Sequence, residues 1–315
     1  MGDRGLRRPR HPARAGHRAG LGRSRRHRHG SGAARAIRPG PFPPVRPALR
    51  RDTAVIESPL REAPLLFVFI DISSLPRHRR LCEDVLGFRV VENQFHPPHE
   101  HHGLVKYDAG GTILALNLFT ESKFRQGTSD ALTLVCRTAG GAGDPRLDAY
   151  GTRAGGLFTD RDGHHFVLGT GDSDRGAEIV EVRLAVASLT ASVPFYRDVL
   201  GLELREQDAA SARFATGTVD LTLELCPDTP DGRKARFNGY LVVLHVPEVR
   251  AAAAALAERG LTFRGPVGFS DIGGTVRFND PTGHVLCLYE PSAESLTWGS
   301  ADKVRELTAG RTHRR

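Results

Sequence analysis

The sequence has few cysteines and no long apolar run. Its four cysteines, Cys82, Cys136, Cys226 and Cys287, lie far apart within apolar segments. This number and spacing exclude a disulfide-dense secreted scaffold and a zinc knuckle, so we expect reduced thiols in a cytoplasmic protein. No stretch approaches about eighteen uninterrupted apolar residues, and the charged N-terminus lacks the apolar segment of a secretory signal. We therefore expect neither a membrane span nor export.

Lysine is also scarce, with four residues against forty arginines, a bias that indicates a GC-rich coding sequence rather than a binding adaptation. The charge is unevenly distributed along the chain. The first 50 residues contain fourteen arginines and one acidic residue, so the remainder carries a net charge of −5 although the whole chain has +8. The folded part offers no positive field to attract a polyanion, which disfavours nucleic acid as its partner.

Residues 1–62 form a leader rich in Arg, Gly, Pro, Ala and His, without strand or helix periodicity. This leader has too few large apolar residues to offset the entropy lost on ordering, so we predict that it is disordered. A solvated tail, an RNA-contacting arginine cluster and an organellar transit peptide are all compatible with its composition. A translation start near Val45 or Val55 is a further alternative.

The rest of the chain contains an internal repeat. Residues 81–88 (LCEDVLGF) realign with residues 195–202 (FYRDVLGL) at a spacing of 114 residues. An alternating apolar stretch that predicts a strand precedes each run. Each run also forms the end of a short amphipathic helix that stops at a glycine, Gly87 or Gly201. We therefore interpret the chain as a duplication.

A second unit of the same kind follows each copy. In the C-terminal half, residues 240–246 predict a strand and residues 249–259 an Ala-rich helix, and residues 280–283 (DPTG) predict a tight turn between two further strands. The first half has a similar turn at residues 160–163 (DRDG), but residues 140–151 contain too many glycines and aspartates for an equivalent helix. The sequence predicts an α+β fold of four strand-helix-strand-strand-strand (βαβββ) units, paired within each half.

Two of these motifs carry a family resemblance. Residues 195–202, followed by residues 279–291 (NDPTGHVLCLYEP), resemble a domain of the vicinal oxygen chelate (VOC) superfamily, which includes glyoxalases, bleomycin-resistance proteins and extradiol dioxygenases. The first copy matches more loosely. The resemblance implies two tandem VOC domains, at residues 63–172 and 177–293, with residues 294–315 as a tail. Pairing within one chain would leave either a monomer or a homodimer possible.

The resemblance also implies where a metal would bind. In that superfamily, side chains from the first and last strands of paired units hold a divalent ion that acts as a Lewis acid on two vicinal oxygens. The corresponding residues of the C-terminal domain are Glu181, Glu224, Leu241 and Cys287. Those of the N-terminal domain are Phe67, Asn117, Leu132 or a neighbour, and Val167. A catalytic site needs about three protein ligands, so the N-terminal cup is expected to be metal-free and ring-cleaving dioxygenase activity is disfavoured.

A non-standard metal site stays open in the C-terminal domain. Strand alternation places Glu181 and Arg183 on one face, and His245 on the face of Leu241. A divalent Fe, Zn, Ni or Mn ion could then be held by Glu181, Glu224, His245 and Cys287. In the simpler alternative Glu181 pairs with Arg183, and Cys287 is a small core residue.

Two groups of histidines elsewhere in the sequence also have a metal-binding and a simpler interpretation. The loop at residues 95–102 could capture metal or be a solvated lid, and of His164 and His165 at most one points inward.

Three classes of function are compatible with this sequence. The first is a small-molecule binding protein of the bleomycin-resistance type, whose ligand would contact Phe67, Asn117, Arg183 and Leu241. The second is a metal-dependent enzyme, a glyoxalase-like lyase or isomerase or a dioxygenase relative, that uses the non-standard ligands. The third is an interaction protein whose cups have closed. One fold supports all three, so the choice depends on the site.

Overall fold

A computed structural model of the chain describes residues 58–94, 103–118, 131–172, 176–226 and 239–309. The predicted leader lies almost entirely outside these residues, and so does the histidine-rich loop. Among the described residues, no helix combines the length and the apolarity that crossing a bilayer requires.

The described residues form four βαβββ modules, and the first strand of each lies at the centre of a sheet. Module 1 contains β1 (Leu65–Ile72), α1 (Leu75–Arg79) continued by the π-helical turn η1 (Arg80–Leu86), β2 (Arg89–Asn93), β3 (Gly103–Asp108) and β4 (Ile113–Leu118). Module 2 contains β5 (Leu132–Thr138), the 3-10 turns η2 (Gly141–Gly143) and η3 (Pro145–Ala149), β6 (Gly151–Ala154), β7 (Leu157–Asp160) and β8 (His165–Thr170).

Modules 3 and 4 repeat this order. Module 3 contains β9 (Glu178–Val186), α2 (Leu189–Pro194), η5 (Phe195–Val199), β10 (Glu203–Gln207), β11 (Ser211–Ala215) and β12 (Asp220–Leu225). Module 4 contains β13 (Tyr240–His245), α3 (Val249–Glu258), β14 (Gly268–Ser270), β15 (Gly273–Asn279) and β16 (Val285–Pro291). The turn η7 (Ser295–Thr297) and the helix α4 (Ala301–Ala309) follow.

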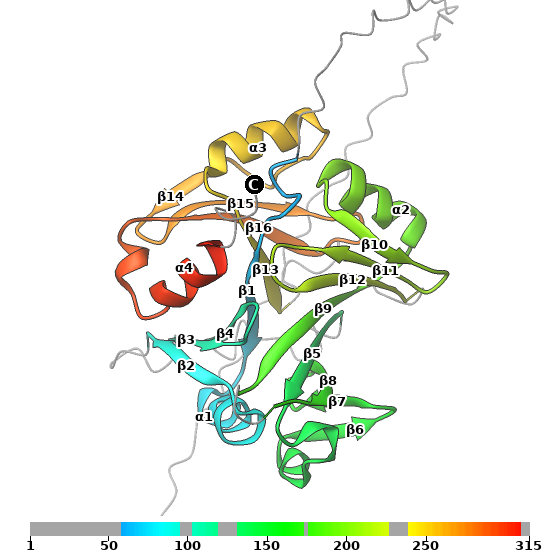
Figure 1. The fold of residues 1–315 in the computed structure, drawn as a ribbon, viewed down its shortest axis with the longest axis vertical. Helices are drawn as coiled ribbons and strands as arrows, with labels where there is room; N and C mark the ends of the chain where they lie inside the picture. The colour runs from blue at the N-terminus through cyan, green and yellow to red at the C-terminus, as the bar shows by residue number, and fades with distance from the viewer. Residues whose placement is uncertain (1–57, 95–102, 119–130, 173–175, 227–238, 310–315) are drawn as a thin grey trace, which may run out of the picture. The chain divides into compact units, whose positions relative to one another are not determined.

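The four modules pair into two eight-stranded mixed sheets (Figure 1). Sheet A joins modules 1 and 4 in the order β14-β15-β16-β13-β1-β4-β3-β2, and sheet B joins modules 2 and 3 in the order β10-β11-β12-β9-β5-β8-β7-β6. At the centre of each sheet two first strands pair antiparallel, β1 with β13 and β5 with β9. The α+β fold of paired βαβββ units is thus confirmed.

The choice of partners differs from the sequence expectation. Units were expected to pair within residues 63–172 and within residues 177–293, whereas each sheet takes one module from each of these segments. The physical reason is that all four first strands are rich in apolar residues. Such a composition favours burial of a strand but does not fix which strand lies beside it.

The predicted helix ends at Gly87 and Gly201 are confirmed. Both residues adopt the left-handed conformation, with φ of 84° and 73°, which glycine adopts without the steric cost of a Cβ atom. A Cβ on Gly201 would also lie 2.2 Å from the Cβ of Ser58. This position therefore requires glycine twice over, for its backbone angle and for its close packing.

The segment after β16 is not a simple tail. Residues 292–309, which we call the C-terminal strap, include η7 and α4, and α4 lies beside sheet A (Figure 1). Val304 and Leu307 of this helix join a small apolar cluster with side chains of β1, β4, β13 and β16. The strap thus covers the face of sheet A that is opposite the main core, whereas the corresponding face of sheet B carries partly exposed polar residues such as Glu181 and Arg183.

Candidate functional site

A cavity of about 390 Å³ lies on the face of sheet A that the strap covers. Its volume is within the range of pockets for small organic molecules, about 300–1,000 Å³. The floor consists of side chains from the central strands, Phe67, Phe69, Leu241, Val243, Cys287 and Tyr289. The strap contributes the roof, with Leu296, Trp298 and Val304. Most of the wall is therefore apolar or aromatic.

A small polar group also lines the cavity. It consists of Asp71, Asn117 and Arg277. The Asn117 side-chain amide donates a hydrogen bond to Asp71 Oδ1 at 3.1 Å. Burial raises the pKa of Asp71 to about 6, although the Asn117 hydrogen bond and the charges of His164 and Arg277 act in the opposite direction. This carboxyl group can therefore either donate or accept a hydrogen bond near neutral pH.

Buried charges fasten the strap over the cavity. Lys106 Nζ donates to Glu92 Oε1 at 2.9 Å and to Ser300 Oγ at 3.3 Å. Glu92 Oε2 accepts from the backbone N–H of Ser300 at 3.0 Å, just before α4 begins. Lys106 Nζ also lies 5.5 Å from the ring centre of Phe67 and 5.7 Å from that of Trp298. Burial alone would raise the pKa of Glu92, but Ser300 and Lys106 hold it below its ordinary value.

Three of the residues predicted to contact a ligand meet in this cavity. Phe67, Asn117 and Leu241 all line it, and so does Cys287. These residues do not fit a metal ion, because a phenyl ring and an isobutyl group offer no ligand atom. Burial also raises the pKa of the Cys287 thiol to about 11, which disfavours a metal-binding thiolate.

The corresponding face of sheet B is polar. It is lined by acidic and basic side chains together with uncharged polar ones such as Thr222. Arg183, the fourth residue predicted to contact a ligand, lies here and donates to Glu181 Oε2 at 3.0 Å and to Glu224 Oε1 at 2.9 Å. A guanidinium thus stands between the two carboxylates, as in the simpler alternative. Val135, the neighbour of Glu181 in the next strand, offers no further ligand.

The structure separates the four residues that were expected to converge on a metal. Glu181 and Glu224 lie on sheet B, whereas His245 and Cys287 lie on sheet A. They therefore do not form one ligand set. The reason is the module pairing, because module 3 joins module 2 and module 4 joins module 1.

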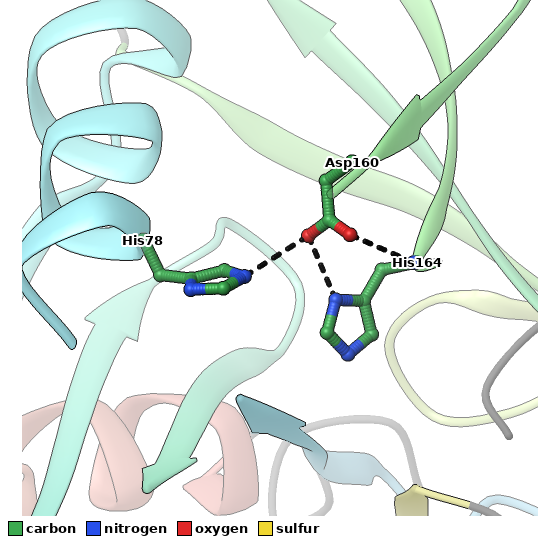
Figure 2. Close-up of side chains that lie close together, drawn as sticks. All are labelled: His78, Asp160 and His164. Carbon is green, nitrogen blue, oxygen red and sulfur yellow. Dashed lines mark hydrogen bonds and ion pairs between the residues drawn. The ribbon is translucent and has the colours of Figure 1, made fainter. Parts of the chain in front are cut away.

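A buried group of metal-binding residue types lies elsewhere, between α1 and the turn from β7 to β8 (Figure 2). His78, Asp160 and His164 each offer one ligand atom, and these atoms lie within 4.8 Å of one another, so the group could hold a metal ion. Sequence reasoning required that at most one of His164 and His165 points inward, and His164 is the buried one. It missed His78, whose only signal was its place on the buried face of a short helix.

Residues 178–288 match the model of the Glyoxalase/Bleomycin resistance protein/Dioxygenase superfamily. Over these residues the chain is similar to this superfamily, also called the VOC superfamily. The match covers module 3 and most of module 4, and modules 1 and 2 repeat the same topology.

Two solved structures show the same fold along most of this chain. A putative dioxygenase from Bacillus subtilis is 11% identical with a TM-score of 0.55, over 80% of this chain and 97% of that one. Glyoxalase I from Zea mays is 16% identical with a TM-score of 0.52, over 80% of this chain and 98% of that one. Identities this low establish the fold alone. No curated protein matches the sequence significantly.

Proposed function

We propose that this VOC protein binds a small, largely apolar organic molecule in the cavity on sheet A. The observation that carries the proposal is the chemistry of the cup floor. Phe67, Leu241 and Cys287 stand where the superfamily resemblance places metal ligands, and together they form an apolar surface under an aromatic roof. Such a surface favours sequestration of a ligand rather than Lewis-acid chemistry.

The lining residues indicate the class of ligand. Aromatic rings face the cavity from the floor and from the roof, which favours a flat or aromatic body stacked between Phe69, Tyr289 and Trp298. Asp71 and Asn117 would orient one hydroxyl, amide or amine group of the ligand. Burying on the order of 200 Å² of apolar ligand surface would contribute about 5 kcal/mol before the entropic costs of association are subtracted.

The strap supplies the route for entry. Its polar contacts with module 1 are those of Ser300 with Glu92 and Lys106, and the ion pair of Lys303 with Asp108 at 3.0 Å. Its apolar side chains rest on the cup floor. Lifting the strap would open the cavity, and closing it over a bound ligand would shield the ligand from water. We therefore expect slow dissociation relative to an open cup of the same composition.

Trp298 gives a direct test, because it is the single tryptophan of the chain and lines the cavity. Titration with a panel of aromatic and polycyclic compounds should give a saturable change of its fluorescence for at least one compound. The variant Leu241→Arg should abolish that change while the protein stays folded by circular dichroism. A matched control is Thr133→Arg, since Thr133 pairs with Arg183 in sheet B as Leu241 pairs with Phe69 in sheet A. Binding that survives Leu241→Arg, or the absence of any ligand, would contradict the proposal.

A further inference from the structure

We propose that His78, Asp160 and His164 form a buried structural site for a divalent ion of the zinc class, which clips module 1 to module 2. The site is separate from the ligand cavity, since none of the three side chains lines it. His78 comes from α1, and Asp160 and His164 flank the turn from β7 to β8. An ion here would therefore join sheet A to sheet B.

The first observation is that two imidazole nitrogens converge on one carboxylate oxygen (Figure 2). His164 Nδ1 lies 2.7 Å and His78 Nε2 3.2 Å from Asp160 Oδ2. Zinc binds imidazole nitrogen at about 2.0–2.1 Å and carboxylate oxygen at about 2.0–2.2 Å, so ligand atoms around it stand roughly 3 Å apart. The three atoms need only small shifts to surround an ion.

The second observation is how the other ring nitrogens are held. His78 Nδ1 lies 2.7 Å from the carbonyl oxygen of Ser74, and His164 Nε2 lies 3.0 Å from that of Asp71. Both of these nitrogens therefore carry a hydrogen and donate to the backbone. This is the usual second-shell arrangement of metal-binding histidines, because it fixes the tautomer and directs the opposite nitrogen at the ion.

The carboxylate is held in position as well. Asp160 Oδ1 accepts from the backbone N–H groups of Asp162 and His164 at 2.8 and 2.9 Å, which leaves Oδ2 for the two histidines. Asp162 Oδ2 lies 3.3 Å from His78 Nε2 but already accepts from the backbone N–H of Ser73 at 2.7 Å, so it supports His78 rather than adding a ligand. Two imidazole nitrogens and one carboxylate oxygen form a set that suits zinc and related first-row divalent ions.

Burial supports a structural role. His78, Asp160 and His164 are each at most 5% exposed, and none of them lines the ligand cavity. Such a position suits a structural rather than a catalytic ion, because a buried ion is not accessible to substrate.

The other half of the molecule provides an internal comparison. Asp280 Oδ1 caps the turn from β15 to β16 by accepting from Gly283 and His284. His284 Nε2 bonds to the carbonyl oxygen of Ala185 at 2.8 Å, as His164 does to that of Asp71. The partner of Asp280 is not a second histidine, however, but the Tyr196 hydroxyl at 3.0 Å.

The repeat spacing shows where the two halves diverge. The position equivalent to His78 is Ser192, whose hydroxyl has no hydrogen-bond partner. The turn and its cross-module histidine therefore form without a metal in the second half. His78 is the added group, and it turns a structural hydrogen-bond network into a set of metal ligands.

The test uses the full-length protein, stripped with a chelator and then dialysed with zinc. Metal analysis by mass spectrometry should find about one zinc ion per chain that is absent in His164→Gln and in Asp160→Asn. The Asp160→Asn variant keeps an oxygen to cap the turn, so it separates loss of metal from loss of folding. His284→Gln, the matched control from the second half, should retain the zinc. Added zinc should raise the melting temperature of the wild type and of the control by several degrees, but not that of the other two variants.

Cobalt provides a readout that needs no variant. Substituted Co²⁺ should give the visible absorption of a four-coordinate site with nitrogen and oxygen ligands, without thiolate charge-transfer bands. Zinc that persists in both first-half variants would belong to other histidines and would overturn the proposal. So would a wild type that takes up no zinc. Neither result bears on the ligand cavity, because the Trp298 titration does not require metal.

Discussion

Replacing Glu92 with glutamine tests whether this carboxylate holds the C-terminal strap over the cavity. Glu92 and Lys106 are each 6% exposed, so the substitution leaves a buried ammonium without its counter-ion. Removing one partner of a buried ion pair costs about 3–5 kcal/mol. Glutamine keeps one oxygen for the Ser300 N–H, so we expect about 2–3 kcal/mol of lost stability, concentrated in the strap.

Three assays measure this effect. Urea unfolding should show a lower midpoint, Trp298 emission should shift to longer wavelength as the roof opens, and limited proteolysis should cleave within residues 292–309. The control is Asp302→Asn, which removes an ion pair with Arg305 in the same helix, where Asp302 is almost fully exposed. That variant should behave as wild type. A Glu92→Gln protein with unchanged emission and unchanged protease resistance would refute the role of this carboxylate.

The same pair predicts a pH dependence. The pKa of Glu92 is lower in the folded state than its ordinary value. Its contribution to stability is therefore fully present above the ordinary pKa of about 4.3 and is lost as the pH falls through the folded value. The difference in stability between wild type and Glu92→Gln should shrink below about pH 4. A difference that stays constant from pH 7 to pH 3 would contradict this sign.

Further predictions concern sheet B and the helix ends. Arg183→Met should lower the free energy of unfolding, measured in urea, by about 1 kcal/mol, because Glu181 and Glu224 then repel each other without a cation. Added Mn²⁺ should restore part of this loss. An unchanged free energy of unfolding would show that this ion-pair network contributes nothing. Gly201→Ala should cost more than about 1 kcal/mol in thermal unfolding, because alanine meets both the positive φ and Ser58. The corresponding Gly87→Ala, which has open space around its Cβ position, should cost less.

The sequence predicts the units of this fold better than their assembly. The repeat, the helix ends at Gly87 and Gly201, and the turns at residues 160–163 and 280–283 depend on local backbone preferences, and all are present in the structure. The lack of a regular helix at residues 140–151 was also predicted, and short 3-10 turns stand there. Pairing between modules depends on side-chain contacts across the whole chain, and no local pattern encodes it.

The candidate sites depend on contacts between residues far apart in the sequence, which sequence patterns do not reveal. His78 reaches Asp160 across 82 residues of sequence, and Lys106 reaches Ser300 across 194. Contacts at such separations leave no periodic signal. The strap was similarly hidden, because its short amphipathic helix finds its apolar partner only on the completed cup floor. Predictions from motifs therefore found the strands that carry the sites but not the ion pairs, the roof or the buried histidine.

The sheet register explains why neither half of the sequence has a full set of metal ligands at the positions that the family resemblance indicates. Phe67 pairs with Val243, which in turn pairs with Cys287, so these apolar side chains belong to one cup. Glu181 and Glu224 belong to the other, where both pair with Arg183. Two incomplete metal sites in the sequence are thus two cups of opposite character in the structure. Because each cup takes one module from each half, residues of both halves together make the sheet A cup apolar. This shared apolar lining agrees with the proposal that the sheet A cup is the part of the molecule that binds a ligand.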